Sequence, residues 1–137
     1  MLMKIDLESD VPIYQQLHNS IMEGIASKEL APGDSLPSVR AMASDLGVNM
    51  HTVNKAYQIL KQEGFIQIHR QKGVVIQPDQ MPPADEPYLE SLTGKLRPLI
   101  SEAICRGLDE KQFLKICEKL YNDIQKSYGV MSRVKNK

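Results

Sequence analysis

The sequence contains no tryptophan, and aromatic residues make up only 5% of its 137 residues. Because the hydrophobic fraction is still 42%, the chain is expected to fold, with a core of mainly aliphatic side chains. Long apolar runs are also absent: no stretch approaches the roughly 18 residues of a membrane span, and the N-terminus lacks the apolar run of a signal peptide. We therefore expect a cytoplasmic chain with no membrane partner.

Cysteine is scarce as well. Cys105 and Cys117 lie late in the chain without a CxxC spacing, which favours a reducing compartment and small apolar residues on helices. The sequence also lacks a glycine-rich phosphate loop, a nucleophile elbow and paired catalytic carboxylates. We therefore expect no enzymatic activity, no cofactor and no metal ion.

There is no excess of charge of one sign, because 17 basic residues balance 17 acidic residues. A zero net charge argues mildly against a nucleic-acid-binding protein. The charges are unevenly distributed along the chain, however. The charged residues of 1–37 are mainly acidic, whereas those of 38–78 are mainly basic: Arg40, Lys55, Lys61, Arg70 and Lys72 against Asp45 and Glu63. The second segment could therefore face phosphate groups.

Three helices are predicted in the first half of the chain. After a short strand in residues 1–7, apolar residues at every fourth position predict a helix from Pro12 to about Lys28. Ser38 and Gly47 predict the start and the stop of a second helix, and Asn49 and Gly64 those of a third. The predicted inward residues of the last two helices are Val39, Met42, Ala43, Leu46, Val53, Ala56, Tyr57 and Leu60.

Two β-branched runs follow the third helix. Residues 65–68 and 74–76 flank the polar segment 69–73 and predict a β-hairpin with Arg70 and Lys72 at its tip. Residues 78–87 contain four prolines and three acids, which predicts a stiff polar linker. The predicted organisation is a domain at 1–77, a linker at 78–87, helices at 88–130 and a flexible tail at 131–137.

The order helix, helix, tight turn, helix, hairpin is the layout of a winged helix-turn-helix. The major groove of B-DNA, about 12 Å wide, admits the third helix. The side chains predicted to face outward near its start can bond to bases or phosphates, and Arg40 and the hairpin tip can add contacts. From the layout, the candidate DNA contacts are Arg40, Asn49, Met50, His51, Thr52, Asn54, Lys55, Arg70 and Lys72.

Residues 5–76 resemble the DNA-binding domain of the GntR family. The matching residues include Leu36-Pro37-Ser38, Arg40, Leu46-Gly47-Val48, Thr52-Val53, Tyr57 and, in the wing, Lys72-Gly73. The resemblance implies a homodimer on a palindromic DNA operator, and it adds Ser38 and Gly73 to the candidate contacts. Many relatives have an arginine just after the cap of the recognition helix, where this chain has Met50, so the operator sequence cannot be taken from them.

Two amphipathic helices are predicted after the linker. Pro98 predicts a kink or a displaced start in the first of them, and Asp109 with Gln112 resembles a capping box at the start of the second. This part is similar to the tail of the YtrA subfamily, which implies a repressor. It is too short to enclose a ligand pocket of the usual size, and no effector is identified.

These two helices cannot bury their apolar stripes alone, so pairing with a second copy is the simplest interpretation. The alternative is that they fold back on the DNA-binding domain. The predicted dimerisation residues are Leu92, Leu96, Leu99, Ile100, Ile104, Phe113, Ile116, Leu120 and Ile124.

The predicted fold class is mainly α with a small β-hairpin: an N-terminal winged helix-turn-helix and a C-terminal two-helix dimerisation segment. The predicted function is a sequence-specific transcriptional regulator. One alternative is a metal- or redox-sensing regulator that uses the two cysteines or His18, His51 and His69. The other is a winged helix that binds another protein.

Overall fold

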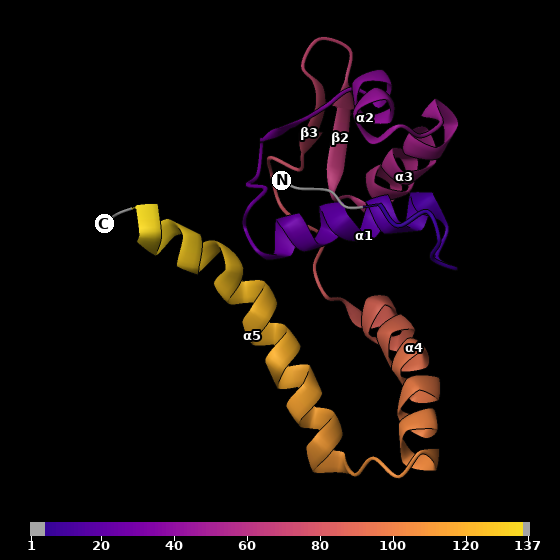
Figure 1. Ribbon diagram of the computed structural model, residues 1–137. Helices are drawn as coiled ribbons and strands as arrows, with labels where there is room; N and C mark the ends of the chain where they lie inside the picture. Colours follow the sequence, from indigo (N-terminus) through magenta and orange to yellow (C-terminus); the bar gives the residue numbers. More distant parts are fainter. Residues whose placement is uncertain (1–4, 136–137) are drawn as a thin grey trace. The chain divides into compact units, whose positions relative to one another are not determined.

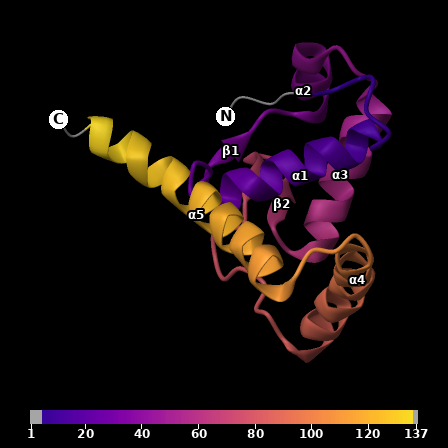
Figure 2. The same cartoon turned by 60° about the horizontal axis from the view of Figure 1, so that its bottom comes forward.

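The computed structural model of the protein describes residues 5–135, which divide into two compact units between Pro82 and Pro83. The boundary falls inside the predicted proline-rich linker. The N-terminal unit contains α1 (Ile13–Ala26), β1 (Ser35–Leu36), α2 (Val39–Leu46), α3 (Met50–Glu63), β2 (Ile66–His69) and β3 (Gly73–Ile76), and the C-terminal unit contains α4 (Glu86–Cys105) and α5 (Glu110–Lys135). Figures 1 and 2 show these elements from two directions. The predicted mainly helical fold class is confirmed.

The small sheet has three strands rather than the two of the predicted hairpin. Its order is β1-β3-β2, and both pairs are antiparallel. Strand β3 pairs with β2 through Ile66↔Ile76 and with β1 through Leu36↔Val74. The turn between β2 and β3 projects from the unit at the end away from α1 (Figure 1). This turn is the wing of the predicted fold.

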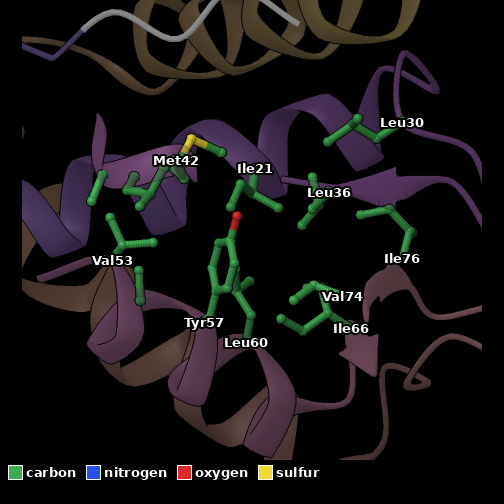
Figure 3. Close-up of a cluster of buried hydrophobic side chains, with 13 residues drawn as sticks. Ile21, Leu30, Leu36, Met42, Val53, Tyr57, Leu60, Ile66, Val74 and Ile76 are labelled. Atoms are coloured by element: carbon green, nitrogen blue, oxygen red, sulfur yellow. The ribbon is translucent and has the colours of Figure 1, made fainter. Parts of the chain in front are cut away.

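The hydrophobic core of the N-terminal unit joins all of its helices and strands. Helix α3 packs on α1, α2 and β2, and the ring of Tyr57 extends from α3 toward Ile21 (Figure 3). The predicted inward residues of α3 are all buried. The buried cluster consists of Leu17, Ile21, Leu30, Leu36, Met42, Ala43, Val53, Ala56, Tyr57, Leu60, Ile66, Val74 and Ile76.

The N-terminal strand predicted in residues 1–7 is not present in its described part. Residues 5–7 form no strand, and Leu7 is 74% exposed. The backbone N–H of Asp6 instead donates to Gln16 Oε1 (2.8 Å), which ties this segment to α1. An alternating apolar pattern over so few residues was too short to predict a strand reliably. The rest of the prediction falls on residues 1–4, outside the described residues.

Helices α4 and α5 differ at their ends from the predicted ranges. Helix α4 begins at Glu86 with Asp85 as its cap, so Pro87 lies in its first turn rather than in the linker, a position that tolerates proline. Pro98 lies inside α4 and does not displace its start. The capping box at α5 is confirmed, because Asp109 and Gln112 exchange hydrogen bonds of 2.8 and 2.9 Å. Helix α5 continues to Lys135, beyond the predicted end at residue 130.

Two glycines that end helices have left-handed backbones but different surroundings. Gly47 (φ 69°) has open space where a Cβ would lie, whereas a Cβ on Gly64 (φ 90°) would meet Pro82 Cγ at 3.1 Å. We expect Gly47→Ala to lower the free energy of unfolding by about 1–2 kcal/mol, the cost of this conformation for a residue with a side chain. Gly64→Ala should cost more, because Pro82 must also move.

Thermal unfolding of the two single variants and of Gly64→Ala/Pro82→Ala measures this difference. The second substitution should return part of the loss at Gly64. Equal losses of stability in the two glycine variants would show that the contact with Pro82 adds nothing to the cost of the Gly64 substitution.

Candidate nucleic-acid interface

Local hydrogen bonds cap the starts of α2 and α3. The hydroxyl oxygen of Ser38 accepts from the backbone N–H of Ala41 (3.1 Å), and Asn49 Oδ1 accepts from that of His51 (2.8 Å). Gly47 adopts the left-handed conformation between the helices, and Val48 packs against the core. Both capping residues are exposed candidate DNA contacts. As caps they use one oxygen each, which leaves the Ser38 hydroxyl proton and the Asn49 amide protons to donate elsewhere.

The start of α3 and the start of α2 together line a shallow surface hollow. Its lining residues are Val39, Asn49, Met50, His51 and Asn54. Four of them were predicted DNA contacts, and the structure brings these four side by side. Val39 was predicted only as an inward residue. Its exposure at the hollow could not be read from a periodicity, because it depends on where α3 lies beside α2.

Two further candidate DNA contacts on α3 are less accessible to a DNA partner than the sequence pattern predicted. Thr52 is half-buried. Lys55 is exposed, but its Nζ lies 4.0 Å from the centre of the Tyr14 ring on α1, which is a cation–π contact. Tyr14 was missed as a neighbour of the site because it lies on another helix, and nothing in its sequence surroundings indicates this pairing. The contact holds the charge of Lys55 on the side of α3 that faces α1.

The remaining candidates are exposed and basic. Arg40 lies in the first turn of α2, and Arg70 and Lys72 lie in the wing, directly before Gly73 (φ 74°) at the start of β3. In the described part of the chain, none of these three cations forms an ion pair. Their charge is therefore available to an anionic partner.

The residues of the metal-sensing alternative lie in different surroundings. His18 Nε2 is 2.7 Å from Glu63 Oε1 and joins α1 to the end of α3, while His69 Nε2 is 2.7 Å from Gln67 Oε1. Cys105 is exposed and Cys117 is half-buried. Within residues 5–135, no three His, Cys, Asp or Glu side chains form a group that could hold a metal ion.

The C-terminal unit has an apolar surface but no core in its described side chains. Between Glu86 and Lys126, no residue is buried. Six predicted dimerisation residues are exposed, for example Leu99 (58%) and Ile104 (67%), and Leu96, Phe113 and Ile124 are half-buried. The other exposed members are Leu92, Ile100, Ile116 and Leu120. No helix in the described residues is long and apolar enough to cross a bilayer.

Comparison with known proteins agrees with this geometry. The family model described as "Bacterial regulatory proteins, gntR family" matches residues 13–76, from the start of α1 to the end of β3. The HTH-type transcriptional repressor YtrA of Bacillus subtilis (strain 168) is 30% identical over 124 residues, which are 90% of this chain and 95% of that protein. The similarity therefore extends into α4 and α5.

Two solved structures are also similar. YtrA from Sulfolobus acidocaldarius, a GntR-family transcription factor, is 44% identical and aligns with a TM-score of 0.59 over 77% of this chain and 99% of its own. A transcriptional antiterminator from Listeria monocytogenes EGD-e is 29% identical, with a TM-score of 0.84 over 90% of this chain and 92% of its own. The chain therefore belongs to the GntR family of bacterial DNA-binding transcriptional regulators, and it resembles the repressor YtrA of Bacillus subtilis over both of its units.

Proposed function

We propose that this protein is a cytoplasmic repressor that binds a palindromic DNA operator as a homodimer. Helix α3 enters the major groove, and the wing contacts the sugar-phosphate backbone or the minor groove. The observation that carries the proposal is the group of exposed side chains at the hollow, where Asn49, Met50, His51 and Asn54 lie together beside the start of α2. A surface of this kind suits base edges, which present donors, acceptors and methyl groups.

Two basic sites flank this surface in the proposed complex. Arg40 is an exposed cation in the first turn of α2, next to Val39 of the hollow. Lys72 and Arg70 lie at the wing tip. Because phosphate contacts position a protein on DNA and base contacts give specificity, the two sites should differ in their response to operator sequence.

The exposed apolar residues of α4 and α5 support the homodimer. A second copy of the same surface would remove side chains such as Leu99, Ile104 and Leu120 from water, and a two-fold axis closes such an assembly. Two-fold symmetry in the protein requires a palindrome in the DNA, with half-sites about 10 bp apart, centre to centre.

The experiment that tests the function is the selection of bound fragments from a genomic DNA pool, followed by a salt titration on the enriched site. We expect a short palindrome bound at roughly 10⁻⁸ M or tighter, and lower expression from a reporter carrying that site when the protein is present. Enrichment of no sequence would overturn the proposal. Weak binding that ignores both sequence and salt would favour the protein-binding alternative.

The wing is tested with two matched lysine variants. We expect Lys72→Ala to weaken binding to all sequences and to reduce the slope of log K against log salt by about 1, the contribution of one phosphate contact. Lys61→Ala, in the last turn of α3, removes the same charge far from the hollow and should leave the slope unchanged. An unchanged slope for Lys72→Ala would place the wing outside the interface.

A further inference from the structure

We propose that Met50 reads a thymine in each operator half-site by contacting its 5-methyl group at the hollow between α2 and α3. This inference rests on the proposed function and adds to it the base that the hollow selects. It begins from an apolar side chain in an unusual place. Met50 is the first residue of α3 and is 44% exposed, although the other residues that α3 and its cap contribute to this surface are polar.

The hollow has an apolar part and a polar part. Val39, half-buried on α2, and Met50 supply the apolar lining, while Asn49, His51 and Asn54 supply polar groups. Val39 also packs against the core of the unit, so this wall is fixed to the fold. Met50 is flexible and polarisable and can follow the shape of a small apolar partner.

The chemistry of the major groove identifies that partner. Each base presents hydrogen-bonding groups on this edge, and thymine alone of the four also presents a methyl group. The Met50 side chain has no hydrogen-bond donor, and its sulfur is a weak acceptor. The remaining way for it to discriminate between bases is apolar contact with the thymine methyl.

Asn54 strengthens the assignment. It lies four residues after Met50, so the two side chains occupy the same face of α3. Asn54 is exposed, and its side chain makes no hydrogen bond within the described residues. An asparagine amide pairs with adenine N6 and N7 through two bonds. A polar group suited to adenine therefore lies beside an apolar group suited to thymine.

The test uses the full chain and the selected operator, with each thymine replaced in turn by uracil, which removes only the methyl group. We expect one position, repeated symmetrically in the two half-sites, at which uracil weakens binding. The expected loss is roughly fourfold per half-site, which corresponds to the free energy of burying one methyl-sized group. Met50→Ala should bind the thymine operator with a similar loss and should show no further loss with uracil. Met50→Leu, which keeps an apolar side chain, should retain the preference for thymine.

A matched control separates this role from a general weakening of the interface. His51→Ala should lower affinity but keep the uracil effect. A uracil effect that persists in Met50→Ala would assign the methyl group to another residue and overturn the inference. Tight operator binding that no uracil changes would overturn the inference alone, whereas the absence of any bound operator would overturn the proposed function with it.

Discussion

A chain that ends at Pro82 is expected to be a folded monomer that binds the operator roughly 10²–10⁴-fold more weakly than the full chain, the usual gain from linking two binding modules. The buried cluster lies entirely within residues 17–76, and Met81 packs against it, so the truncation removes no core residue. It does remove α4 and α5, whose described side chains are all at least partly exposed.

Analytical ultracentrifugation gives the oligomeric state of both chains, and fluorescence anisotropy gives their affinities for the operator. A truncated chain that still dimerises in solution would contradict the role of α4 and α5. Circular dichroism of the truncated chain shows whether its loss of affinity comes from unfolding instead.

Two single substitutions in the full chain test the same interface without a deletion. Leu120→Lys places a charge among the exposed apolar residues of α5 and should produce monomers. Glu118→Lys adds the same side chain two positions away, which turns it roughly to the opposite side of the helix. The second variant should remain a dimer, and equal dissociation of both would indicate a general charge effect.

Loss of the Tyr57 ring is expected to have the largest effect on stability. Its side chain is fully buried, and its hydroxyl donates to the Pro37 carbonyl (2.8 Å) directly before the cap of α2. Tyr57→Ala should lower the free energy of unfolding by about 3–5 kcal/mol, as for other large aromatic residues. Since small domains are stable by about 5–15 kcal/mol, this variant should unfold near or below physiological temperature.

Tyr57→Phe separates the ring from the hydroxyl. Pro37 is exposed, so water can replace the lost donor, and we expect a cost of about 0.5–1.5 kcal/mol and a melting temperature lower by several degrees. Differential scanning calorimetry of the wild type and both variants measures these losses. A loss for Tyr57→Phe as large as that for Tyr57→Ala would mean that the hydroxyl, rather than the ring, holds this part of the core.

The same residue predicts a response to alkaline pH. Burial raises the pKa of the Tyr57 phenol above its ordinary value of 10.0. Because the folded state holds this proton more tightly than the unfolded state, its contribution to stability is complete below pH 10 and is lost as the pH rises above it. Tyr57→Phe should lack this part of the alkaline loss.

Local signals predicted most of the N-terminal unit. Ser38, Asn49, Gly47 and Gly64 mark helix ends through their own backbone preferences, and the structure places all four where the sequence predicted. The capping box at Asp109 is equally local. Such features depend on three or four neighbouring residues, so a single sequence is enough to find them.

Contacts between distant residues could not be predicted in this way. Strand β1 is two residues long and exists through its pairing with Val74 and Val75 of β3, so no periodicity identifies it. The contact of Lys55 with Tyr14 and the exposure of Val39 at the hollow depend on how the helices pack. For α4 and α5, the pattern identified the apolar residues, but nothing in the described part of the chain covers those that are exposed.

Because its hydrophobic core lies within residues 14–81, the N-terminal unit could be transferred to another protein as a DNA-binding module. A different self-associating segment, such as a parallel coiled coil, could be joined after Pro82 without changing a buried contact of that unit. In such a hybrid, the preferred half-site sequence would be inherited from α3, whereas the affinity and the permitted spacing between half-sites would be set by the new segment.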